Sequence, residues 1–70
     1  MAGIVARSPD ILHGAPVFRG TRVPIKALFD TLADGETLAD FLEGFPSVTR
    51  EMAITVLEQA YKLLSEESEK

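Results

Sequence analysis

The chain has 70 residues, a formal net charge of −4 at pH 7, one histidine and no cysteine. This length allows one domain at most, and the composition excludes disulfides and metal sites built from thiolates or from several imidazoles. No apolar run is long enough to span a membrane and no signal peptide pattern is present, so we expect a cytoplasmic protein without a cofactor.

Two short strands are predicted in the first third of the chain. Residues 4–7 begin with an apolar pair and are followed by the turn sequence Ser8-Pro9-Asp10, while residues 17–19 contain good strand formers. We expect the two segments to pair as an N-terminal β arm of residues 1–23. Because an isolated two-stranded ribbon is marginal in water, the arm must pack on helices or pair with a second chain.

Arg19 and Arg22 lie where this arm is expected to bend, since Gly20 interrupts a run of strand-forming residues. Two interpretations of these arginines remain open. They are solvated charges that discourage aggregation of a sheet edge, or they contact an acidic partner. His13 lies in the preceding loop and matches no catalytic spacing, so we do not expect an enzyme.

The first helix is predicted over Pro24–Ala33, because apolar residues recur there at spacings of three and four. Proline suits the first helical position, and Gly35 suits the left-handed residue that ends a helix. Lys26 and Asp30 are four residues apart on its exposed side and are expected to pair.

Two further helices are predicted after it. Thr37 followed by Asp40 approximates a capping box for a short second helix, which Pro46 ends. Thr49 caps a third helix over Arg50–Leu64. We therefore expect a mostly α domain over residues 1–64, with three helices behind the β arm, and a flexible acidic tail over residues 65–70.

The third helix carries apolar residues in two adjacent rows, so its apolar band is wider than one neighbour can cover. With 46% hydrophobic residues in so short a chain, more apolar surface is present than the domain can hide. Both observations predict a homodimer or a permanent partner.

Three segments carry a resemblance to a known family. They are residues 10–24 (DILHGAPVFRGTRVP), 32–37 (LADGET) and 45–49 (FPSVT), and the first contains the pattern Gly-x-Pro-x-x-x-Gly-Thr-Arg. On these residues the chain closely resembles the bacterial family called domain of unknown function 433, over nearly all of residues 4–62. The resemblance implies a homeodomain-like helix-turn-helix with an N-terminal β arm, and a role as a VapB-like antitoxin. Members of that family are often encoded beside a PIN-like ribonuclease, which they are thought to neutralise.

The charge is unevenly distributed along the chain. Residues 1–29 carry four basic side chains against one acidic one (+3), and residues 30–70 carry three against ten (−7). Affinity for nucleic acid comes largely from neutralised phosphates, so the arm must contribute if the chain binds DNA.

Two functions are therefore weighed. In the first, an antitoxin dimer represses its own operon, and the expected DNA-binding residues are Arg19, Arg22, Lys26, Arg50 and Thr55. In the second, the chain is a protein-binding module without a DNA role, and an arginine on the bend pairs with the clustered carboxylates of the nuclease. The expected partner-binding residues are Arg22, Phe18 and Tyr61.

Overall fold

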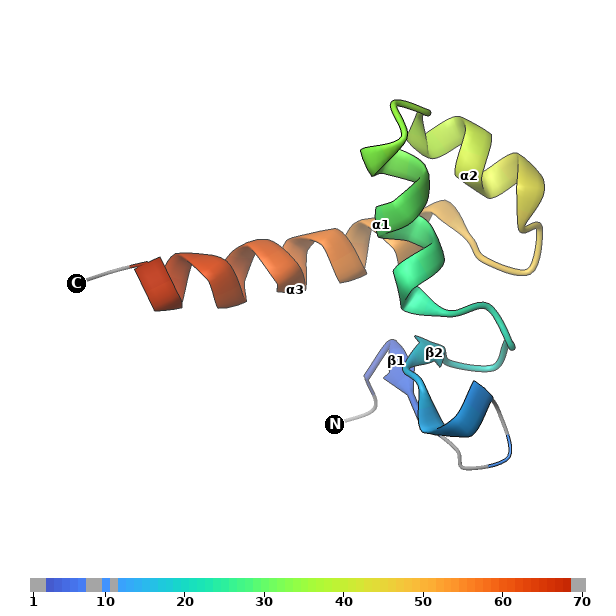
Figure 1. Cartoon of the computed structure of the whole chain (residues 1–70), viewed down its shortest axis with the longest axis horizontal. Helices are drawn as coiled ribbons and strands as arrows, with labels where there is room; N and C mark the ends of the chain where they lie inside the picture. Colours follow the sequence, from blue (N-terminus) through green and yellow to red (C-terminus); the bar gives the residue numbers. More distant parts are fainter. Residues whose placement is uncertain (1–2, 8–9, 11, 69–70) are drawn as a thin grey trace.

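The computed structural model describes residues 3–7, 10 and 12–68, and shows a mostly α domain with an N-terminal β hairpin (Figure 1). In this part of the chain the elements are β1 (Val5–Ala6), η1 (Leu12–Gly14), β2 (Val17–Phe18), α1 (Ile25–Ala33), α2 (Leu38–Gly44) and α3 (Arg50–Ser68). The fold class predicted from the sequence is confirmed. Ser8 and Pro9 of the predicted turn, and residues 69–70 of the predicted tail, lie outside the described residues.

The hairpin pairs the two segments that the sequence predicts, although each strand is shorter than expected. β1 and β2 run antiparallel, with Val5 opposite Phe18 and Ala6 opposite Val17. The connection between them contains η1, a short 3-10 turn that the sequence pattern does not predict. Its central residue, His13, has a φ of 56° and is exposed.

The first helix begins one residue later than predicted. Pro24 has extended backbone angles (φ −69°, ψ 143°) and forms an isolated antiparallel bridge with Val17, so it precedes the helix instead of opening it. The other end is as predicted. Gly35 has a φ of 91°, and its N–H donates to Leu32 while the next N–H donates to Thr31, which is the Schellman pattern.

The caps of the other two helices confirm their predictions. Thr37 and Asp40 form a complete capping box, with side-chain to backbone distances of 3.1 and 3.0 Å. The Thr49 hydroxyl accepts the N–H of Met52 at 3.1 Å. α3 runs to Ser68, beyond the predicted end at Leu64, so residues 65–68 of the expected flexible tail are helical.

The core draws on nearly every element of the domain. Its buried side chains are Phe18, Leu28, Phe41, Val48, Ala53 and Val56. The ring centroids of Phe18 and Phe41 are 6.0 Å apart, which joins the hairpin to α2. Only the first part of α3 enters this core, and Figure 1 shows the remainder of that helix projecting away from the domain.

Candidate functional site

The loop that follows β2 is held by backbone hydrogen bonds on both sides. We call Arg19–Arg22 the arm loop. The N–H of Phe18 donates to the carbonyl of Val23 at 2.9 Å, and the N–H of Thr21 donates to the carbonyl of Phe18 at 2.9 Å. These bonds close the loop on itself, so its two arginines are presented from a defined backbone.

Thr21 and Gly20 account for the shape of the arm loop. The Thr21 hydroxyl donates to the Phe18 carbonyl at 2.8 Å and accepts the Val23 N–H at 3.0 Å. Gly20 has a φ of 81°, in the left-handed region where residues with a Cβ are strained. The bend predicted at this glycine is therefore confirmed.

Arg19 is bound to its own chain. Its Nε donates to the carbonyl of Gly3, and one terminal nitrogen donates to the carbonyl of Val5 at 3.1 Å. Val5 lies in β1 and Gly3 lies two residues before it, so the guanidinium fastens the β1 segment to the end of β2. The side chain stays exposed, but two of its donors are occupied by backbone carbonyls.

Arg22 differs from Arg19 in having no such partner. Its side chain is exposed, and it makes no hydrogen bond or ion pair with any other residue that the structure describes. Because the backbone on both sides of it is fixed, Arg22 offers an unoccupied planar guanidinium to an anionic partner.

Lys26 lies on α1 and is paired as predicted. Its Nζ contacts both carboxylate oxygens of Asp30, at 3.0 and 2.9 Å, with both side chains largely exposed. An exposed pair of this kind contributes little to stability. The carboxylate nevertheless offsets the charge that Lys26 would offer to DNA.

The two residues expected to reach DNA from α3 lie on different sides of it. Arg50 is exposed at the start of the helix, and Thr55 is half-buried. Five residues at about 100° each place them about 140° apart around the helix axis. One surface therefore cannot use both equally, and Arg50 is the accessible one.

The two apolar residues expected to bind a partner have opposite environments. Phe18 is 0% exposed and lies in the core, so the prediction that its side chain contacts a partner is wrong. The reason is that its ring packs inside the core, with its centroid 6.0 Å from that of Phe41. Tyr61 is 74% exposed on the projecting part of α3.

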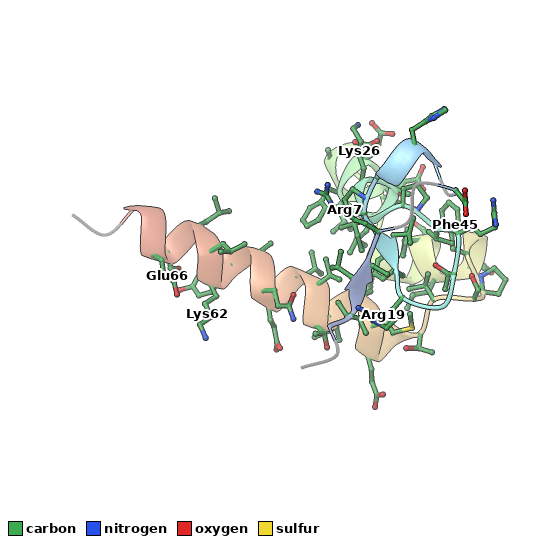
Figure 2. All side chains as sticks on the ribbon, turned by 90° about the horizontal axis from the view of Figure 1, so that it is seen from below. Arg7, Arg19, Lys26, Phe45, Lys62 and Glu66 are labelled. Carbon is green, nitrogen blue, oxygen red and sulfur yellow. The ribbon has the colours of Figure 1, made fainter. Side chains whose placement is uncertain are left out.

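Leu63 and Leu64 belong to the apolar rows predicted for the third helix, but neither is among the expected partner-binding residues. Leu63 and Leu64 are 65% and 64% exposed, but they lie about 100° apart around the helix axis. Leu64 lies on the same side as Tyr61, and these two residues form a second candidate surface on the outer part of α3. The signal for it was the apolar band of the third helix. Figure 2 shows Lys62 on this projecting part, whereas Arg19 lies at the domain.

Neither surface is a metal site or a membrane segment in the described part of the chain. Residues 3–7, 10 and 12–68 contain no group of three or more histidine and carboxylate side chains that could hold a metal ion. No helix among them is long and apolar enough to cross a membrane.

Comparison with known proteins identifies the family. Residues 5–60 match the family model described as "Protein of unknown function (DUF433)". The chain belongs to this family. The DUF433 match includes the whole hairpin and the arm loop, and it ends just before Tyr61.

The chain is also similar to a protein of greater length. The chain is 48% identical over 48 residues to "Uncharacterized protein y4eO" of Sinorhizobium fredii (strain NBRC 101917 / NGR234). The alignment covers 69% of this chain and 22% of that protein, so the chain spans about a fifth of the relative's length. No solved structure matches the chain.

Proposed function

We propose that this DUF433 chain is the antitoxin of a type II toxin–antitoxin system. It neutralises a PIN-like ribonuclease and, as a homodimer, binds its own promoter DNA. The observation that carries the proposal is the arm loop, which presents the unpartnered guanidinium of Arg22 on a backbone fixed by Thr21 and Gly20. The resemblance described above supplies the class of partner.

Neutralisation of the nuclease depends on the planar guanidinium of Arg22. PIN-like nucleases hold metal ions with clustered carboxylates, and a guanidinium pairs with a carboxylate through two parallel hydrogen bonds. Arg22 enters the metal site of the nuclease and competes with the ion for these oxygens. The acidic second half of the chain lies against the basic, RNA-binding rim of the nuclease.

A pull-down with the product of the neighbouring gene tests this neutralisation. Arg22→Glu abolishes the complex, because it places a carboxylate among carboxylates. Lys62→Glu makes the same change of charge on the outer part of α3 and retains the complex. Retention of the complex by the Arg22→Glu variant would reject the placement.

In the proposed binding to DNA, α2, the connection over residues 45–49 and α3 act as a helix-turn-helix. Arg50 at the start of α3 faces the major groove, and the arm loops of the two subunits contact phosphates. Between Arg50 and Glu58 the helix has one basic and two acidic side chains, so the arm loop contributes more of the affinity.

A titration against the protein's own upstream DNA at several salt concentrations tests this binding. Arg22→Ala weakens binding to all sequences and lowers the salt dependence by about one counterion per site. Arg19→Ala has a smaller effect on affinity, because two of its donors already bind backbone carbonyls. Affinity that does not fall with added salt would contradict DNA binding by the arm loop.

The alternative is a protein-binding module without a DNA role. Two observations favour it: Arg19 is bound to its own strand, and residues 30–70 carry a charge of −7. The pull-down and the DNA titration distinguish the two functions. A chain that captures the nuclease but shows no salt-dependent binding to its upstream DNA would be a protein-binding module without a DNA role.

A further inference from the structure

The outer part of α3 presents apolar side chains that the described chain does not cover. Tyr61 and Leu64 are among the most exposed large apolar residues, and Figure 1 shows this part of the helix projecting from the domain. An exposed apolar surface of this kind marks an interaction site in a chain of this size. The question is what covers it.

The spacing along α3 indicates another helix. Four apolar residues recur at intervals of three, four and three, and we call them the α3 stripe: Ile54, Leu57, Tyr61 and Leu64. At about 100° per residue they lie within about 80° of one another around the axis, which is the a and d pattern of a helix–helix seam. Ile54 lies outside the core cluster, whereas Leu57 is partly buried and packs against it, so the stripe runs from the edge of the core to the exposed outer part of the helix.

The α3 stripe is symmetric about residue 59. Ile54 and Leu64 lie five positions on either side of it, and Leu57 and Tyr61 lie two positions on either side. The helix Arg50–Ser68 has the same midpoint, with nine residues before it and nine after it. An antiparallel copy of α3 therefore meets the stripe in register.

We infer that the outer part of α3 is covered by α3 of a second copy of this chain, packed antiparallel about a two-fold axis near residue 59. Each stripe then packs Ile54 against Leu64 and Leu57 against Tyr61 of the other copy. Such an interface is isologous, so every contact occurs twice. This inference rests on the homodimer of the proposed function and gives that dimer its surface.

Charge also favours a second, antiparallel copy as the occupant. In this arrangement Arg50 at the start of one α3 lies at the end of the other, where the helix dipole is negative and Glu66 adds negative charge. A parallel pair would instead bring the two Arg50 side chains together. The antiparallel pair thus aligns the apolar residues of the two helices and brings opposite charges together at their ends.

Sedimentation equilibrium of the chain alone, without DNA or nuclease, tests the surface. Leu64→Glu raises the dimer dissociation constant roughly tenfold or more, because it places a charge in the seam. Leu63→Glu is the matched control: the same substitution at a nearly equal exposure, 65% against 64%, but about 100° away around the helix. It changes the constant by less than about threefold, as expected for a residue beside the seam. Circular dichroism establishes that both variants are folded.

A wild-type chain that remains monomeric across the concentration series overturns the inference. A dimer weakened equally by both substitutions also overturns it, while leaving a homodimer with another interface. Because both readouts use the protein alone, the pairing is measured independently of the proposed function. A dimer with this seam that binds neither DNA nor nuclease would overturn only that function.

Cysteine cross-linking tests the direction of the pair, since the chain has no cysteine of its own. In the antiparallel pair Ile54→Cys faces Leu64→Cys of the other copy, while like positions are about 15 Å apart along the axis, ten residues at about 1.5 Å each. Oxidation of a mixture of the two variants therefore gives the mixed disulfide, and each variant alone gives none. Self-cross-linking of either variant, or no mixed product, would overturn the antiparallel arrangement.

Discussion

At the scale of single residues, the hydroxyl of Thr21 is the part of the arm loop most sensitive to substitution. It donates one hydrogen bond and accepts another, and both bonds are half-buried. Thr21→Val keeps the shape of the side chain but leaves the Val23 N–H without its partner, so we expect the free energy of unfolding to fall by about 1–3 kcal/mol. Thr21→Ser keeps the hydroxyl and should lose much less. Urea denaturation followed by circular dichroism measures both, and equal losses would show that the hydroxyl is not what holds the loop.

Gly20 constrains the same loop through its backbone. A Cβ at this position would meet no atom within 4 Å, so the φ of 81° alone sets the cost of substitution. Gly20→Ala should destabilise the domain by about 1–2 kcal/mol, and Gly20→Asn by less, because asparagine tolerates left-handed angles better.

Gly44 provides the control for this effect. A Cβ there also meets no atom within 4 Å, but Gly44 lies in α2 and its φ is not positive. Gly44→Ala should therefore stabilise the domain, by up to about 1 kcal/mol. Thermal melting at one protein concentration tests this pair: the melting temperature should fall for Gly20→Ala and rise for Gly44→Ala. A neutral Gly20→Ala would contradict the argument from backbone strain.

At the scale of elements, the helix ends could be predicted because each depends on residues close together in the sequence. The Thr37 capping box spans four residues, and Gly35 ends α1 with donors and acceptors at most five positions apart. The pairing of β1 with β2 also followed from two β-type segments separated by turn residues.

The features that the sequence did not predict depend on distant contacts. The bonds of Arg19 to Gly3 and Val5 join residues 16 and 14 positions apart, and no local pattern encodes them. The burial of Phe18 depends on packing against helix residues far along the chain, such as Phe41 of α2. For the candidate site, the sequence placed both arginines on the bend but did not distinguish the bound guanidinium of Arg19 from the unpartnered one of Arg22.

The helix caps give a test that compares identical substitutions. Thr37→Ala and Thr49→Ala each remove a hydroxyl that accepts a backbone N–H at the start of a helix, so each should cost about 0.5–2 kcal/mol of unfolding free energy. Thr31→Ala, inside α1, removes no cap and gains helix propensity, so it should change stability by less. Chemical denaturation of the three variants checks the order. An equal loss at Thr31 would mean that the caps are not the cause.

At the scale of the whole molecule, the hairpin and the helices depend on one small core. Phe18 brings β2 into contact with α2 through Phe41, and it shares its cluster with Ala53 and Val56 of α3. The arm loop is continuous with this strand. Its position relative to the first part of α3 is therefore set by core packing.

The last prediction tests this dependence by comparing two Phe→Ala substitutions. Phe18 is 0% exposed and Phe29, on α1, is 39% exposed. Phe18→Ala should cost about 3–5 kcal/mol, which is much of the total of about 4–10 kcal/mol expected for 70 residues. Phe29→Ala should cost less than half as much, because its ring already contacts solvent.

The signature of a shared core is that the hairpin and the helices lose stability together. Far-ultraviolet circular dichroism follows the helices, and hydrogen exchange of the backbone amides at positions 18 and 21 follows the arm, because both N–H groups are hydrogen-bonded. In the Phe18→Ala variant both should report the same lowered free energy of unfolding. If the helices kept their stability while only the arm exchanged faster, the arm would be an independent unit. Its arginines would then reach a partner by local ordering, and the rigid presentation of Arg22 would no longer support the proposed function.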